Sequence, residues 1–146
     1  MKKILGIVVL MIVMAVSALA ISDTATVPVY LNVPAFVRLS VNDSDGQFDL
    51  VFNPATPAST VADTVALLAE ANVNYSINHS VTPVSGFESW ANLVNISIDT
   101  SVSGYGTPGN VTFNTTASIN VLNNLSLGTV PAGTKIADVV FTISSL

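Results

Sequence analysis

One apolar row constrains the fold of this chain more than any other feature. Within residues 24–41 the positions of one parity are apolar, and those between them hold mostly polar or ring side chains. The apolar members are Val27, Val29, Leu31, Val33, Ala35, Val37, Leu39 and Val41. Because strand side chains alternate between faces, the run would form one apolar face roughly 50 Å long at ~3.3 Å per residue. Strands usually have about 3 to 10 residues, so either Pro34 divides the run into two strands or its first half packs outside its own domain.

The first twenty residues have the composition of an export signal. Lys2 and Lys3 precede an apolar stretch at residues 4–16, and Ala18-Leu19-Ala20 is the small-x-small pattern of a cleavage site. We therefore predict a signal peptide at residues 1–20 and a secreted mature chain that begins near Ile21. The alternative is an uncleaved membrane anchor, because residues 4–21 are just long enough to span a bilayer.

The composition of the mature chain limits its partners and its means of stabilisation. The chain has no cysteine, so disulfides cannot stabilise it outside the cell. Loss of Lys2 and Lys3 leaves two basic residues against nine acidic ones, a formal charge of −7. This balance disfavours nucleic acid and anionic lipid as partners. We expect an N-terminal extension at residues 21–33, followed by one domain of ordinary size at residues 34–146.

Alternation of apolar and polar residues recurs along this domain and predicts strands. The clearest case is residues 110–121, and further runs cover residues 48–52, 64–78, 90–98 and 139–143. Segments rich in Gly, Pro, Asn and Asp separate the runs; we interpret residues 55–63 as a crossover loop, with a helical turn near residues 61–68 as an option. The pattern predicts an all-β fold, an antiparallel immunoglobulin-like β-sandwich of about seven strands. A closed barrel is the alternative.

The residue types that enzymes use are sparse in this chain. The single histidine, His79, lies in a polar segment that we predict to be a surface loop. One histidine and no cysteine leave no zinc or thiol site, and no Gly-x-Ser-x-Gly turn is present. The carboxylates are scattered over predicted loops and outward strand positions. We predict a protein that is not an enzyme and has no cofactor.

Two kinds of surface site are suggested by short motifs. Asp43, Asp45 and Asp49 surround Gly46 and form a weak candidate for calcium; the bidentate Glu of such loops is missing, which favours an ordinary hairpin turn. Asn-x-Ser/Thr triplets are more numerous and are candidates for glycosylation. Their asparagines are Asn42, Asn74, Asn78, Asn95, Asn110, Asn114 and Asn124. A chain rich in Asn, Ser and Thr also produces such triplets by chance.

Without catalysis, assembly is the function that the apolar row favours. A sandwich that lacks one strand leaves an open edge and an exposed core, which an extended segment of another copy can fill by β-augmentation. The donor residues would be Val27, Val29, Leu31 and Val33, each contributing roughly 1.5–3 kcal/mol on burial. Pro28 would remove one ladder donor. Because a head-to-tail contact does not close, copies of the chain would form a filament. The alternative is that residues 24–33 form the first strand of their own domain.

The end of the chain resembles a known group of secreted subunits. Residues 128–134 (GTVPAGT) followed by residues 137–143 (ADVVFTI) look like the end of secreted pilin-type sandwiches, including the spore-coat-U-like family. The segment Asn72-Val73-Asn74-Tyr75 is similar in character. The pattern also resembles self-assembling thread-like pilins, whose subunits donate an N-terminal strand. This chain lacks the cysteine pair and the Tyr after A-G-T that are found in the spore-coat-U-like family, which argues against dependence on a chaperone and usher.

Two further classes of protein share most of these features. A carbohydrate-binding or adhesin domain, with surface glycans as partners, would need exposed aromatic side chains in one plane, for which Tyr30, Trp90 and Tyr105 are the candidates. A cell-envelope or surface-layer protein would differ from a filament subunit only in the geometry of its assembly.

Overall fold

The computed structural model describes residues 23–55, 58–121 and 130–146. The chain divides into two units, residues 1–33 and 34–146. The predicted signal peptide, residues 1–20, lies outside the described residues. No helix in the described part of the chain is both long and apolar enough to cross a membrane. In the first unit, residues 23–33 have no helix or strand and belong to neither sheet.

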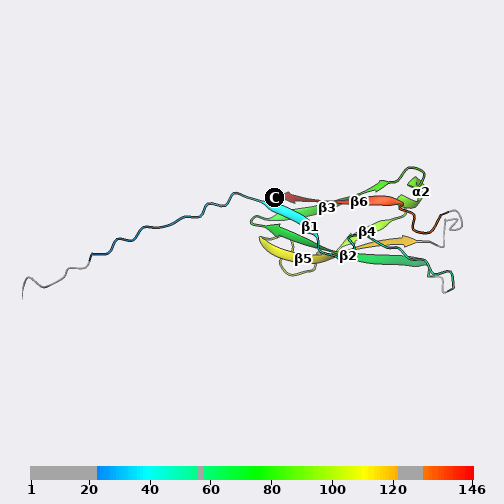
Figure 1. Cartoon of the computed structure of the whole chain (residues 1–146), viewed down its shortest axis with the longest axis horizontal. Coiled ribbons are helices and arrows are strands. Elements are labelled where there is room, and N and C mark those ends of the chain that lie inside the picture. The colour runs from blue at the N-terminus through cyan, green and yellow to red at the C-terminus, as the bar shows by residue number, and fades with distance from the viewer. Residues whose placement is uncertain (1–22, 56–57, 122–129) are drawn as a thin grey trace, which may run out of the picture. The chain divides into compact units, whose positions relative to one another are not determined.

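The described residues of the second unit form an all-β fold with one short helix (Figure 1). Its elements are β1 (Val37–Val41), β2 (Thr60–Ala71), β3 (Tyr75–Pro83), α2 (Glu88–Ala91), β4 (Asn95–Ile98), β5 (Gly109–Asn120) and β6 (Ala137–Ser145). The strands form two antiparallel sheets, one in the order β1-β2-β5-β4 and one of β3 and β6. The described residues thus contain six strands, where the sequence predicted about seven.

The two sheets pack against each other around a shared apolar core. One cluster joins Leu67 and Phe113 of the four-stranded sheet to Tyr75, Phe141 and neighbouring residues of the two-stranded sheet. A second cluster contains Val61, Ile119 and Val121, with Phe52 and Trp90 packed against it. The core therefore extends along β2 and β5, the two longest strands.

Strand β5 confirms the clearest prediction from the sequence. It pairs with β2 along its whole length, from Thr60 opposite Asn120 to Ala71 opposite Gly109. Its odd-numbered residues from Val111 onward are buried and the even-numbered ones are half-buried or exposed. Thr115 is the exception in chemistry, since it is fully buried, but its hydroxyl donates to the carbonyl oxygen of Val65 at 2.9 Å. The closing strand predicted at residues 139–143 is likewise confirmed within β6.

The predicted strand at residues 64–78 is wrong as a single element. Strand β2 ends at Ala71, and β3 begins at Tyr75 in the other sheet. Because both sheets face the same core, the residues of inward parity stay inward across the corner at residues 72–74, and periodicity alone does not reveal the crossing. Strand β2 also begins at Thr60, inside the predicted loop and helical turn. Its ladder with β5 outweighs the helix propensity of Ala, Leu and Glu.

Three other elements differ from the predictions. Residues 48–52 are not a strand, although their side chains alternate in burial. Trp90 lies in α2, ahead of the strand to which it was assigned. Residues 79–83, predicted as loop, continue β3 to Pro83. Among the described strands β3 has a neighbour on one side only, so the missing amide of proline costs no ladder bond on its free edge.

Candidate functional site

The four predicted donor residues lie on a segment that is open to solvent. The exposed fraction of the residue is 79% for Val27, 93% for Val29, 89% for Leu31 and 51% for Val33. The interpretation of residues 24–33 as the first strand of their own domain is therefore wrong for this structure, because only residues 37–41 of the long row form a strand. An apolar row of this length in water is typical of a surface that binds a partner.

The second unit carries a groove along its open side. A cavity of about 960 Å³ lies over the inner face of β2 and β5, between residues 46–52 on one wall and residues 130–141 on the other. A smaller cavity of about 300 Å³ continues it between β1 and β6. The two share Val41, Leu67, Val139 and Phe141, so they form one groove.

The groove is bordered by two strand edges that have no neighbour in the described part of the chain. Strand β1 pairs with β2 only, and β6 pairs with β3 only. Along the free edge of a strand, every second residue directs its N–H and C=O away from the ladder. Such an edge is a template for another strand.

The core beneath the groove is incompletely covered. Val139, Phe141 and Ile143 are the inward residues of β6, yet each is only half-buried. The matching residues of β5 include Phe113, which is 1% exposed. A sheet of two strands faces a sheet of four, so the smaller sheet lacks the width to cover the inner face of the larger one.

The segment that follows β1 and forms one wall of the groove is bonded to the sheet through Asn42 and Asp49. The N–H of Asn42 donates to the carbonyl oxygen of Ala66 at 2.8 Å, and the N–H of Asp49 donates to Oδ2 of Asp63 at 2.7 Å. Asp63 has the inward parity of β2, where apolar residues dominate. The carboxylate of Asp63 thus bonds this wall to the sheet through a side chain, and residues 46–52 are not a strand. Asp63 was not among the predicted site residues, although an acidic residue at an inward position is a detectable exception to the alternating pattern.

The point at which the chain enters the second unit is also fixed. The side chain of Asn72 donates to the carbonyl oxygen of Pro34 at 2.9 Å and accepts from the N–H of Phe36 at 2.8 Å. The N–H of Asn72 also donates to the carbonyl oxygen of Phe36, at 3.3 Å. We name this arrangement the Asn72 clamp. The Asn72 clamp was not predicted from the sequence. Its sequence signal is an Asn-x-Asn segment between two apolar runs, which is typical of a turn that bonds nearby backbone.

The other predicted site residues are not brought together. Asp43, Asp45 and Asp49 each accept a local hydrogen bond, from Ser44 or Gln47. No group of three or more His, Asp or Glu side chains in the described ranges lies close enough to hold a metal ion. His79 lies on β3, not in a loop, with its ring 6.3 Å from that of Phe141.

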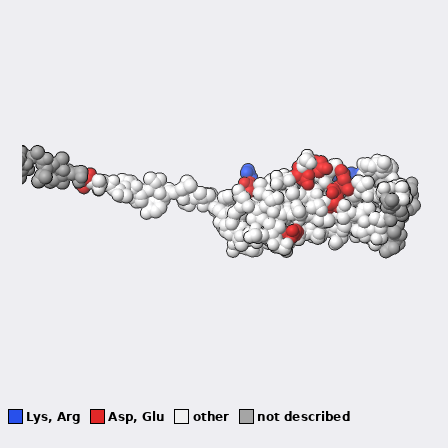
Figure 2. Space-filling model, turned by 90° about the horizontal axis from the view of Figure 1, so that it is seen from below, with Lys and Arg blue, Asp and Glu red and all other residues white. Residues whose placement is uncertain are grey.

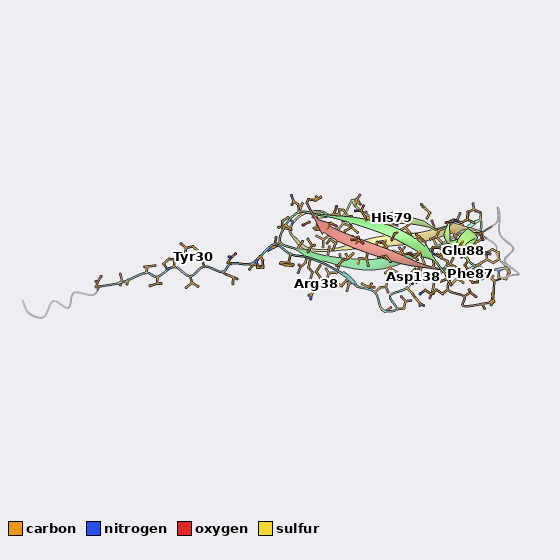
Figure 3. All side chains as sticks on the ribbon, turned by 90° about the horizontal axis from the view of Figure 1, so that it is seen from above. Tyr30, Arg38, His79, Phe87, Glu88 and Asp138 are labelled. Carbon is orange, nitrogen blue, oxygen red and sulfur yellow. The ribbon has the colours of Figure 1, made fainter. Side chains whose placement is uncertain are left out.

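The candidate carbohydrate aromatics do not form a platform. Tyr30 lies on the extension (Figure 3). Tyr105 packs against Phe113 with ring centroids 5.3 Å apart, and Trp90 packs on the separate cluster of Val61 and Ile119.

The asparagine triplets occupy several surfaces. Asn42, Asn78, Asn95, Asn110 and Asn114 are exposed, and Asn74 is exposed in the turn before β3. Asn124 lies outside the described residues. Figure 2 shows that most of the visible face of the second unit carries no charged side chain.

Comparison with known proteins adds no assignment. No protein-family model, curated protein or solved structure matches this chain.

Proposed function

We propose that this protein is an extracellular structural subunit that polymerises by donor-strand complementation. In this proposal residues 1–20 direct export, and residues 34–146 form an immunoglobulin-like sandwich from which one strand is missing. The extension of one copy, residues 21–33, fills the groove of another copy. Repetition of this head-to-tail contact gives a pilus-like filament at the cell surface.

The observation that carries the proposal is the coexistence of a donor and an acceptor in one chain. Four aliphatic side chains of one parity are exposed on the extension, and the second unit has an apolar groove between two free strand edges. Burial of four such side chains would contribute roughly 6–12 kcal/mol before the cost of ordering the extension. Strand addition would also pair the free backbone groups of β6.

The deciding experiment compares the mature chain with a chain that lacks the extension. We expect residues 21–146 to form filaments visible by negative-stain electron microscopy, and residues 34–146 to remain a folded monomer with a β-type circular dichroism spectrum. A synthetic peptide of residues 21–33 should then bind the truncated monomer and raise its melting temperature. Unfolding of the truncated chain would indicate that the extension belongs to its own domain, and a monodisperse mature chain at high concentration would contradict polymerisation.

A further inference from the structure

We propose that consecutive copies contact each other end to end, with no flexible linker between their domains. At this joint, Phe36 and the Asn72 clamp of one copy lie against one end of the groove of the next copy. This inference rests on the proposed function, and it adds the surface through which neighbouring domains contact each other. It concerns two ends of the second unit, which the topology distinguishes.

The first end is where the chain enters the domain, and we name it the entry end. Strand β1 begins there, and the Asn72 clamp joins Phe36 to the corner between β2 and β3. Strand β6 finishes at the same end, because the N–H of Leu146 donates to the carbonyl oxygen of Asn74 at 2.9 Å. Arg38, on β1, lies toward this end, whereas Phe87 and Glu88 lie at the opposite end (Figure 3).

The groove has a larger volume at the opposite end and a smaller one toward the entry end. Strand β1 pairs only with residues 67–71 of β2, and it lies next to β6 in that half of the domain. There the groove holds about 300 Å³. The larger part, about 960 Å³, reaches Trp90, Val94 and residues 130–136 beyond the end of β1. We name that part the groove mouth.

The two ends of the domain set the direction in which a donor strand can be inserted. The amino end of the donor is free after cleavage, whereas Val33 is joined to its own domain through Pro34. If Val33 emerged at the entry end, two entry ends would face each other and the pair would close into a dimer. A filament therefore requires Val33 at the groove mouth, with the donor antiparallel to β6. The entry end of the donating copy then faces the groove mouth of the accepting copy, and successive copies repeat in one direction.

The covalent distance between donor and domain is very short. Val33 is the last of the four donor residues, and the carbonyl oxygen of the next residue, Pro34, is already bonded to Asn72. One residue of extended chain spans only ~3.3 Å. The two domains must therefore touch, and the clamp fixes the angle at which the chain passes between them.

The surfaces that would meet are suited to contact. Phe36 is 46% exposed beside the clamp, so contact would remove an aromatic ring from water. Across the joint, Pro131, Ala132 and Gly133 are exposed and uncharged at the groove mouth. Two of the charged residues toward these ends are paired within one domain, Arg38 with Glu70 at 3.6 Å and Lys135 with Asp138 at 2.6 Å.

The test measures filament geometry in variants that keep the donor residues intact. Insertion of Gly-Ser between Val33 and Pro34 should still give filaments, but with an axial repeat longer by up to about 7 Å and a severalfold shorter persistence length in electron micrographs. Asn72→Ala should give filaments of similar repeat that bend severalfold more. Phe36→Ser should act in the same direction, and Asn74→Ala, at an exposed residue outside the groove, is the control that leaves stiffness unchanged.

The outcomes separate this inference from the proposed function. If the wild-type mature chain forms no filaments, both fail. If it forms filaments and the Gly-Ser insertion changes neither the axial repeat nor the stiffness of the filament, the domains are not held by a short connection. In that case this inference alone is overturned. The insertion lies outside both sheets, so this test holds even if Asn72→Ala does not fold.

Discussion

Two apolar rows of this chain look alike in sequence and have opposite surroundings in the structure. Strand β5 has strands on both sides, β2 and β4, and its Phe113 is 1% exposed. On the extension, Val29 is 93% exposed and has no sheet neighbour among the described residues. Alternation of apolar and polar residues therefore predicts that a segment can pack on a core. Which core it packs on depends on where a strand edge is free. The predictions below test this difference, in order of decreasing effect.

The largest effect is expected in the buried row. Phe113→Ala should lower the free energy of unfolding by about 3–5 kcal/mol, because it removes a fully buried ring and leaves a cavity. Urea denaturation of the mature chain at a concentration that keeps it monomeric measures the change. Val29→Ala in the same assay should leave the midpoint unchanged. An equal loss for both variants would mean that the extension packs in its own domain.

The second effect concerns assembly. Val29→Asp should raise the concentration needed for filament formation at least about tenfold. The contact between donor strand and groove would lose roughly 1.5–3 kcal/mol of apolar burial and gain a buried charge. Sedimentation of polymer at increasing protein concentration measures this threshold. Asn32→Asp is the matched control, since it adds the same charge at the opposite parity and should assemble nearly normally. Equal thresholds for the two variants would contradict insertion of one face.

A smaller effect is expected in the wall of the groove. Asp63→Ala removes the acceptor of the Asp49 N–H, and should cost about 1 kcal/mol, near the lower end for a hydrogen bond to a partly solvated carboxylate. Hydrogen exchange at residues 48–52 should become faster, while exchange in β5 stays unchanged. Asp49→Ala keeps the backbone donor and should leave exchange at these residues slow. Fast exchange in both variants would show that the Asp63 contact does not hold the wall.

The smallest effect is a dependence on alkaline pH. Burial raises the pKa of Tyr105, and the nearby Tyr75 raises it further. The folded state thus favours the neutral phenol, so this contribution to stability is complete below the ordinary tyrosine pKa of about 10 and is lost as pH rises through the raised value. Melting temperatures between about pH 8 and pH 11 measure it. Tyr105→Phe, which keeps the ring beside Phe113, should reduce the alkaline decline; an identical decline would assign it to another group.

Prediction from the sequence succeeds where the pattern is local and the strand has neighbours. Strand β5 and the closing strand β6 follow directly from alternation and turn composition. The all-β class follows as well, because several such runs occur with no long helical pattern. The apolar parity of residues 27–33 is also visible in the sequence, whereas their exposure is a property of the structure.

The failures have a common physical origin in the corners and edges of the sheets. The crossing at residues 72–74 preserves inward parity, so a two-residue period continues through it. Residues 48–52 alternate in burial but bond through Asp63, which no strand propensity describes. The Asn72 clamp depends on two segments more than thirty residues apart and has no local signature beyond its turn residues. Long-range hydrogen bonds therefore limit what periodicity reveals about the site.

Pro28 has a consequence for the fate of the free extension before it meets a partner. A fibrillar aggregate of extensions would stack each one between two others and require amides directed to both sides along its whole length. Proline interrupts one of these two rows of amides. Addition to the edge of a folded domain requires only one row, and a register in which Pro28 faces away loses nothing. If the extension adds to a folded domain as proposed, Pro28 would thus favour ordered strand addition over amyloid-like aggregation.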